Sequence, residues 1–175
     1  SRPRALGDEG ERARTVERRQ QPSVTGPLGR ARAPDARVLA AARDRTVANV
    51  GRLVSRMAKG LGMQPIGFDP FISPKVAEDL GIPLESNLLD LVQKADFLTV
   101  HVPLSPETRG LLSREVLGRA RPGLRLVNCA RGGIVDEEAL LDLLEKGVLA
   151  GVALDVFAKE PPGVTPLLRH PRAAR

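Results

Sequence analysis

A glycine and an aspartate are spaced as they are in a dinucleotide-binding fold. Gly51 stands near the start of a stretch with helical periodicity, and Asp69 follows it by 18 residues, at the end of the apolar stretch "PIGFD". In such a fold a glycine lets the first helix pack closely on the sheet, and an acid about 20 residues later bonds the adenosine ribose. An acid there also repels a 2′-phosphate, which favours NAD over NADP. A plain helix followed by a strand that ends in an Asp-Pro turn explains these two residues equally well.

Two of the three glycines that should open this helix are missing. The pattern G-x-G-x-x-G would place glycines at Thr46, Ala48 and Gly51, and only Gly51 matches. A Cβ at Ala48 would stand where the pyrophosphate must approach, although the backbone N–H groups of Asn49 and Val50 would still face it at the helix N-terminus. The preceding "ARDRTVAN" is charged where an apolar strand is expected. We therefore expect an incomplete pyrophosphate site and a missing first strand.

Helices and strands alternate from about residue 46 onward. Helices are expected over residues 50–62, 73–81, 87–95, 105–121 and 136–147, and strands over residues 64–69, 96–102, 124–130 and 150–157. Alternation at this spacing predicts βαβ units and a parallel sheet. The predicted fold class is α/β, an incomplete Rossmann-like doubly wound parallel sheet with a disordered N-terminal tail.

Composition divides the chain into three parts. Residues 1–45 are dominated by Arg, Ala, Pro and Gly, and they carry too little apolar surface to offset the entropy of ordering. Within them only "PDARVLAAARD" is expected to form one short helix. Residues 46–168 are predicted to be a partial NAD-binding domain, and residues 169–175 a disordered C-terminal end. Either end could also be a GC-rich reading frame translated out of phase.

The net charge of +6 comes from the two ends of the chain. Residues 1–45 carry 11 Arg against 6 acids, and residues 169–175 add three Arg, which leaves the middle mildly acidic. No basic stripe with interleaved aromatic residues accompanies this charge, so nucleic acid is not the predicted partner. No apolar run approaches the roughly 20 residues that cross a bilayer. The single cysteine, Cys129, excludes an intrachain disulfide and fits a reducing, cytoplasmic setting. No metal site is predicted.

Three stretches resemble the D-isomer-specific 2-hydroxyacid dehydrogenases in order and spacing. They are "DFLTVHVPLSPETRGLL", "LVNCARGGIVDEEAL" and "GVALDVFAKEPP". The resemblance covers about residues 46–168, most of that family's nucleotide-binding domain after its first strand. It implies NAD as cofactor, a small 2-hydroxy acid as substrate of the complete enzyme, and a homodimer formed through the NAD domain. Which 2-hydroxy acid is used stays open. A function of a different class also stays open, namely a non-catalytic module that binds a nucleotide or a protein.

The resemblance assigns two residues to catalysis. Arg131, in "NCARGG", matches the arginine that binds the substrate carboxylate and polarises its carbonyl. A guanidinium suits this role because it binds a carboxylate bidentately and keeps its charge. Glu160, in "AKEPP", matches the glutamate that orients a catalytic histidine and raises its pKa. A surface arginine in a turn is the alternative for Arg131.

Further residues are assigned to the cofactor. His101 stands at the carboxyl end of a strand, where ligands bind in open α/β sheets, and a capped loop histidine is an equal alternative. Asp155, in "ALDVF", matches a residue at the nicotinamide end of the cofactor pocket. Cys129 has no partner that would make it a nucleophile, so a buried, packing thiol is predicted. The predicted cofactor-binding set is Asn49, Val50, Gly51, Asp69, His101, Val102, Pro103, Cys129, Ala130, Arg131 and Asp155.

The family's catalytic histidine is not expected within this sequence. The family continues past "PLLRHP" into another strand and a loop that carries the histidine, whereas this sequence ends at Arg175. His101 and His170 stand in other motifs. Because general acid–base groups contribute about 10²–10⁴-fold, the chain alone is expected to bind NAD weakly at best and to be inactive as a dehydrogenase. A missing first strand would also expose a sheet edge and an apolar helix face.

Overall fold

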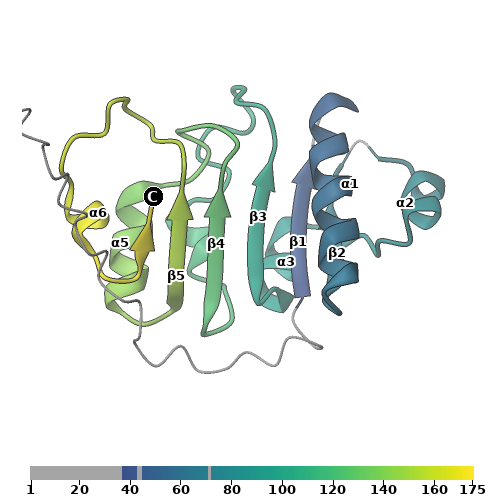
Figure 1. Cartoon of the computed structure of the whole chain (residues 1–175), viewed down its shortest axis with the longest axis horizontal. Coiled ribbons are helices and arrows are strands. Elements are labelled where there is room, and N and C mark those ends of the chain that lie inside the picture. Colours follow the sequence, from purple (N-terminus) through teal and green to yellow (C-terminus); the bar gives the residue numbers. More distant parts are fainter. Residues whose placement is uncertain (1–36, 43–44, 71) are drawn as a thin grey trace, which may run out of the picture.

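The structure, a computed structural model, describes residues 37–42, 45–70 and 72–175. Within these ranges six strands form one parallel sheet in the order β2-β1-β3-β4-β5-β6 (Figure 1). The strands are β1 Arg37–Ala42, β2 Gln64–Phe68, β3 Phe97–His101, β4 Leu124–Asn128, β5 Leu149–Leu154 and β6 Ala173–Ala174. The predicted α/β class and the parallel sheet are confirmed.

Strand β1 corrects the prediction for the residues before the first helix. Residues 37–42 were expected to be helical within a disordered tail, but they pair on both sides, with β2 and with β3. The stretch "RVLAAA" is rich in alanine, a strong helix former. The uncharged run after Arg37 nevertheless also suits a strand with neighbours on both sides. The first strand is therefore present rather than missing. The rest of the predicted tail, residues 1–36, lies outside the described residues.

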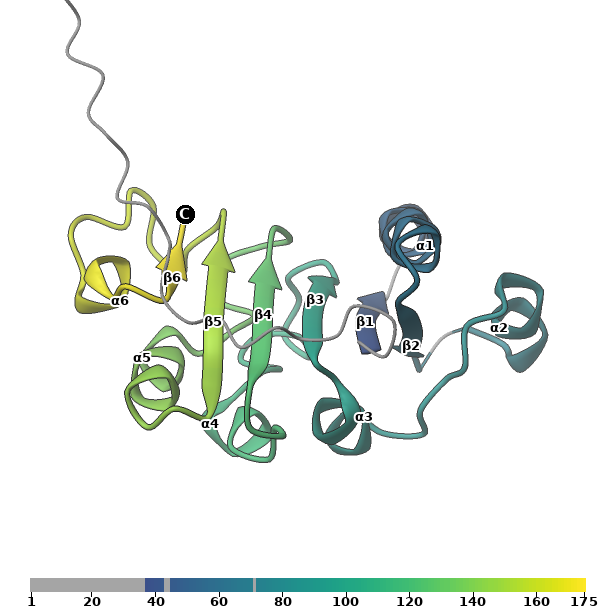
Figure 2. The same cartoon turned by 60° about the horizontal axis from the view of Figure 1, so that its bottom comes forward.

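Helices cover both faces of the sheet (Figure 2). Their bounds are α1 Arg45–Gly60, α2 Pro74–Leu80, α3 Leu88–Lys94, α4 Arg114–Leu117, α5 Glu137–Glu145 and α6 Pro166–Arg169. Figure 2 shows α3, α4 and α5 beneath one face and α1 on the other, above β1 and β2, whereas α2 and α6 lie at the two edges of the sheet. None of the helices in the described ranges is both long and apolar enough to span a membrane.

The core lies between the sheet and the layer of α3, α4 and α5. Alternate residues of the central strands point into this layer, and Leu98, Leu126 and Val152 are each at most 4% exposed. The residues between them, such as Thr99 and Val127, are half-buried on the face that carries α1. This alternation follows from the period of two in a strand, and it gives the sheet one well-covered face and one more open face.

The helix expected over residues 105–121 is reduced to α4. Thr108 donates from Oγ1 to the Pro103 carbonyl at 2.6 Å and accepts from the Ser105 N–H at 2.8 Å, which closes a turn instead. Gly110 has a φ of +63°, outside the helical region. Side-chain hydrogen bonds of this kind compete with helix formation. The helix therefore begins only after Ser113, whose hydroxyl caps it.

The C-terminal residues also differ from the prediction. Residues 169–175 were expected to be disordered, but Arg169 ends α6 and residues 173–174 pair with β5 as strand β6. The guanidinium of Arg172 donates to the Leu149 carbonyl at 3.3 Å and to the Leu144 carbonyl. This end of the chain is an ordered part of the sheet, which argues against translation out of phase there.

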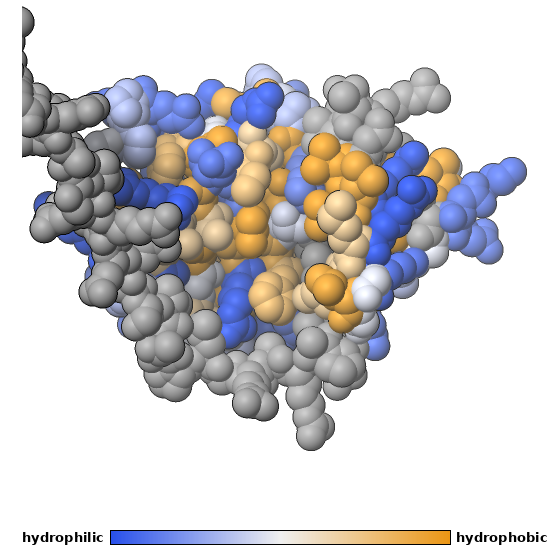
Figure 3. Space-filling view, in the orientation of Figure 1, coloured by the Kyte–Doolittle hydropathy of each residue, from blue (hydrophilic) through white to orange (hydrophobic). Residues whose placement is uncertain are grey.

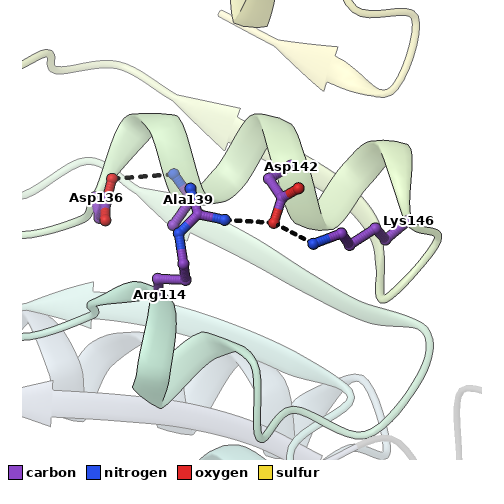
Figure 4. A network of polar contacts seen from close by, with 5 residues as sticks. All are labelled: Arg114, Asp136, Ala139, Asp142 and Lys146. Atoms are coloured by element: carbon purple, nitrogen blue, oxygen red, sulfur yellow. Dashed lines mark hydrogen bonds and ion pairs between the residues drawn. The ribbon is translucent and has the colours of Figure 1, made fainter.

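Charged side chains join α4 to α5 on the surface (Figure 4). Arg114 pairs with Asp142, and Lys146 donates to the same carboxylate at 2.9 Å. The hydrogen bond from Lys146, together with the two positive charges, lowers the pKa of Asp142. At the start of α5, Asp136 accepts from the Ala139 N–H at 3.0 Å. The ion pairs thus link α4 to α5, and Asp136 caps α5 directly after the double-glycine turn.

A candidate active site at the carboxyl edge of the sheet

The strand order reverses between β1 and β3. The chain leaves β1 to form β2 on one side and returns to form β3 on the other side. Ligands in open α/β sheets bind outside the carboxyl ends of the strands at such a reversal. His101 ends β3 in register with Ala42, the last residue of β1, and α1 begins at the same edge (Figure 1). This edge is the candidate site.

Three loops leave this edge after β3, β4 and β5. The first two are joined by backbone hydrogen bonds, from Gly110 N to Gly133 O at 2.8 Å and from Leu112 N to Ile134 O at 3.1 Å. The second and third meet at Gly132, where an added Cβ would stand 1.8 Å from the carbonyl oxygen of Phe157. The three loops therefore form one connected unit.

Both predicted catalytic residues lie in this unit. Arg131 is exposed and donates from Nη1 to the Ala130 carbonyl at 2.6 Å. Glu160 is exposed too, and its Oε1 accepts from the Phe157 N–H at 3.1 Å. The close approach of Gly132 to Phe157 brings the turn of the arginine against the loop of the glutamate.

The side chain of Asn128 forms two hydrogen bonds with the backbone of this turn, a role that sequence reasoning did not predict. This side chain is buried, with the residue only 2% exposed. Nδ2 donates to the Arg131 carbonyl at 3.1 Å, and Oδ1 accepts from the Ala130 N–H at 3.1 Å. The backbone carbonyl of Asn128 accepts from the Asp155 N–H at 3.0 Å. An Asn between a buried strand and a glycine turn was the available signal, since its side chain readily bonds the backbone two residues on.

Several predicted cofactor residues border the same edge. Asp69 follows β2 directly and is 8% exposed, Val102 is 4% exposed, and Pro103 is half-buried. Ala130 is half-buried after β4, and Asp155 is exposed after β5. They come from the ends of β2, β3, β4 and β5, so the topology gathers residues that are far apart in the sequence.

The start of α1 is the weakest part of the predicted site. The helix already begins at Arg45, so Thr46 and Ala48 lie inside its first turn rather than in a glycine loop. Asn49 and Val50 follow one turn later, and Val50 is 48% exposed. The next residue of the predicted set, Gly51, is buried, as close packing of helix on sheet requires.

Cys129 corrects a prediction. A buried, packing thiol was expected, but Cys129 is exposed. The reason is its position directly after the last residue of β4, where the chain leaves the sheet and turns. Its backbone lies between the buried Asn128 and the half-buried Ala130.

His101, the last residue of β3, is buried, with 8% of its surface exposed. Its Nε2 lies 3.0 Å from the Oγ1 of Thr99, two residues earlier on β3. Desolvation by burial lowers the pKa of His101 from its ordinary value of 6.5. The ring is therefore neutral at pH 7, able to donate from one nitrogen and accept at the other.

This burial predicts a stability that depends on pH. Below about pH 6.5 the unfolded chain binds a proton at His101 more readily than the folded chain, so the free energy of unfolding falls as the pH is lowered from 7.5 to 5.5. One proton limits the slope to about 1.4 kcal/mol per pH unit. In urea unfolding at several pH values, His101→Gln should remove part of this slope. Equal slopes in the unchanged chain and the variant would contradict the assignment.

The residues present fit the adenosine ribose of NAD better than its pyrophosphate. Asp69, a buried carboxylate directly after β2, suits hydrogen bonds from the ribose hydroxyls. The pyrophosphate position has Thr46 and Ala48 within a helix instead of a glycine turn.

Comparison with known proteins shows the family. The family profile for the NAD binding domain of the D-isomer specific 2-hydroxyacid dehydrogenases matches residues 46–174. The chain belongs to this family, whose cofactor is NAD. The resemblance seen in the sequence is therefore confirmed.

Several curated relatives are named D-3-phosphoglycerate dehydrogenase. D-3-phosphoglycerate dehydrogenase of Methanocaldococcus jannaschii is 45% identical over 119 residues, which is 68% of this chain and 23% of the relative. The human enzyme of the same name is 48% identical over 124 residues, 69% of this chain and 22% of the relative. The chain thus spans less than a quarter of the length of the relatives it matches.

Solved structures share the fold. D-mandelate dehydrogenase of Rhodotorula graminis superposes with a TM-score of 0.72 at 28% identity, over 81% of this chain and 41% of that chain. A glyoxylate reductase from Paecilomyes thermophila gives a TM-score of 0.70 at 34% identity, over 81% of this chain and 42% of that chain. The NAD binding domain is thus common to proteins whose named substrates differ.

Proposed function

We propose that this domain serves a D-3-phosphoglycerate dehydrogenase, which oxidises 3-phosphoglycerate to 3-phosphohydroxypyruvate in serine biosynthesis. The observation that carries the proposal is the 44–48% identity to curated relatives of that name. The solved glyoxylate reductase is 34% identical, so a reductase of the glyoxylate or hydroxypyruvate type is the second candidate.

Each residue of the predicted site has a proposed role. Arg131 binds the carboxylate of the 2-hydroxy acid, because its planar fork matches two carboxylate oxygens. Glu160 orients a histidine that protonates or deprotonates the substrate oxygen, and Asp69 accepts hydrogen bonds from the adenosine ribose. Asn49, Val50, Gly51, His101, Val102, Pro103, Cys129, Ala130 and Asp155 line the cofactor. NAD, when bound, supplies the hydride acceptor.

The 175-residue chain alone is proposed to bind NAD weakly and not to turn over substrate. Neither of its histidines is bonded to Glu160: His101 is bonded to Thr99, and the Nδ1 of His170 accepts from the Arg172 N–H at 3.2 Å. A site without its proton-transfer group loses about 10²–10⁴-fold in rate.

Turnover of the purified chain tests this proposal. With 3-phosphohydroxypyruvate and NADH we expect no loss of absorbance at 340 nm above the rate without protein. A turnover number near the roughly 10 s⁻¹ of ordinary enzymes would contradict it. Glyoxylate, assayed in parallel, separates the two candidate substrates if turnover does occur.

A non-catalytic module that binds a nucleotide or a protein remains the proposal of a different class. The replaced glycines Thr46 and Ala48 favour it, because they weaken the part of the site that holds the pyrophosphate. NADH binding without turnover would be consistent with this reading, and enzymatic turnover would exclude it.

The proposed partner is a second copy of the chain, bound through an apolar flank of α1. This flank consists of Val50, Leu53, Met57 and Leu61, which are 48%, 51%, 66% and 72% exposed. Their spacing of three and four residues places them on one side of the helix. The apolar helix face expected from the sequence is thus exposed, although β1 is present. Figure 3 shows apolar side chains gathered along α1 and over the adjoining middle of the sheet.

The opposite flank of α1 is already occupied. Lys59 donates from Nζ to the Gly81 carbonyl at 2.7 Å, which ties that flank to the end of α2. The apolar flank therefore faces away from α2, toward the more open face of β3 and β4. An apolar surface in this position is typical of a protein–protein contact.

Two charges on the apolar flank should separate the copies. We expect the chain to sediment as a dimer at about 100 µM and the double variant Leu53→Glu/Met57→Glu to sediment as a monomer, because burying unpaired carboxylates is costly. Lys75→Glu, an exposed change on α2, is the control and should remain dimeric. A monomeric wild-type chain at every concentration would contradict the proposed homodimer.

A further inference from the structure

We propose that Asn128 is a positioning residue, whose buried carboxamide sets the turn that carries Arg131 and whose backbone carbonyl aligns Asp155 across the same edge. The inference rests on the proposed function insofar as Arg131 is the residue that binds substrate. It concerns a residue that touches neither substrate nor cofactor in that proposal.

The turn is fixed at two points by one side chain. Asn128 accepts from the N–H of Ala130 and donates to the carbonyl of Arg131, both at 3.1 Å. The backbone between these two groups contains the Cα atoms of Ala130 and Arg131 and the peptide that joins them. The orientation of the carboxamide is unambiguous, because a backbone N–H can only donate and a carbonyl can only accept.

Aspartate, serine and leucine do not offer the same pair of bonds. Aspartate keeps the acceptor for Ala130 but loses the donor to Arg131 and would bury a charge, with Asn128 being 2% exposed. Serine keeps a short hydroxyl but lacks the second arm. Leucine has a similar volume and neither bond, and it would leave the two backbone groups unsatisfied.

The position of the Arg131 guanidinium depends on this turn. Its side chain is exposed and donates to the carbonyl of its own neighbour Ala130, rather than to another part of the fold. The backbone of the turn therefore decides where the guanidinium points. The backbone carbonyl of Asn128 accepts a hydrogen bond from the Asp155 N–H at 3.0 Å. Asn128 therefore contacts both the turn that carries Arg131 and the start of the loop after β5.

Amide exchange and relaxation of the full chain by NMR test the inference. Asn128→Leu, which has neither bond, should raise the exchange rate of the Ala130 amide about tenfold or more, because a buried hydrogen bond is lost. Asn128→Asp should leave that amide protected and instead increase the fast motion of the Arg131 amide. In both variants the amides of Leu98 and Leu126, in the centre of the sheet, should exchange as in the unchanged chain.

Asn87 provides a matched control. It caps α3 with the same kind of bond, its Oδ1 accepting from the Asp90 N–H at 2.8 Å, and it is exposed. Asn87→Asp should alter neither the Ala130 amide nor the motion of Arg131. If one of the two Asn128 variants fails to fold, the exchange and relaxation data of the other variant test the inference.

Two results would overturn the inference. One is an unchanged turn, with wild-type exchange at Ala130 and wild-type motion of Arg131 in the Asn128 variants. The other is exchange that rises equally at Leu98 and Leu126, which would indicate a general structural role. Addition of 3-phosphoglycerate, followed at the Nε–H of Arg131, tests the proposed function separately. A wild-type chain without any shift there would contradict substrate binding by Arg131 and leave the exchange result on Asn128 intact.

Discussion

Replacing Gly132 by alanine is expected to lower the free energy of unfolding by about 3 kcal/mol or more. The new Cβ would lie 1.8 Å from the carbonyl oxygen of Phe157, 2.1 Å from its carbonyl carbon and 2.7 Å from the nitrogen of Ala158. These are backbone atoms, so no side-chain rotation relieves the contact. Urea unfolding followed by far-UV circular dichroism measures the change.

Gly60→Ala is the matched control for this prediction. Gly60 is the last residue of α1 and has no atom within 4 Å of an added Cβ. Alanine there should change the free energy of unfolding by less than about 1 kcal/mol. If Gly132→Ala proves as stable as Gly60→Ala, the loops after β4 and β5 do not pack as described.

Replacing Asp69 by alanine is expected to weaken NADH binding by about 10- to 100-fold, as the loss of a hydrogen bond to a charged group would. The affinity for NADPH should fall much less, because the same carboxylate repels the 2′-phosphate. The preference for NADH over NADPH should therefore shrink or reverse. Titrations followed by the fluorescence of the reduced nicotinamide suit this chain, because it has no Trp or Tyr.

Asp79→Asn controls for the lost charge. Asp79 lies on α2 and is exposed, so its replacement should leave both affinities unchanged. An Asp69→Ala variant that keeps the wild-type ratio of NADH to NADPH affinity would show that Asp69 does not face the ribose.

Most of the fold followed from the periodicity of the sequence, and the departures have a common cause. Strands β2 to β5 lie where apolar runs of five to six residues alternate with helical patterns. Strand β1 was not predicted, because its alanines favour a helix locally and only pairing with β2 and β3 makes them a strand. Strand β6 depends in the same way on its neighbour β5.

In the candidate site, too, the sequence predicted residues at the ends of elements but not contacts that form only in the folded chain. Asp69 and His101 were predicted from their places at the ends of expected strands, and the structure has Asp69 directly after β2 and His101 as the last residue of β3. Gly51 was expected near the start of the first helix, but α1 begins at Arg45, so Gly51 lies in its second turn. Asn128 was missed because its role depends on contacts with Ala130 and Arg131 that exist only once the turn has formed. Cys129 was predicted to be buried from its residue type, and its place after the end of β4 exposes it.

Backbone chemical-shift mapping of the 175-residue chain with NADH tests the central claim most directly. If the carboxyl edge of the sheet is an NAD site with an impaired pyrophosphate end, millimolar NADH should shift the amides of Asp69, His101, Cys129 and Asp155. Asp142, in the surface network of Figure 4, should not move. The shifts should titrate with weak, saturable affinity. Shifts that are absent at several millimolar NADH, or that centre on α4 and α5, would contradict a cofactor site at this edge.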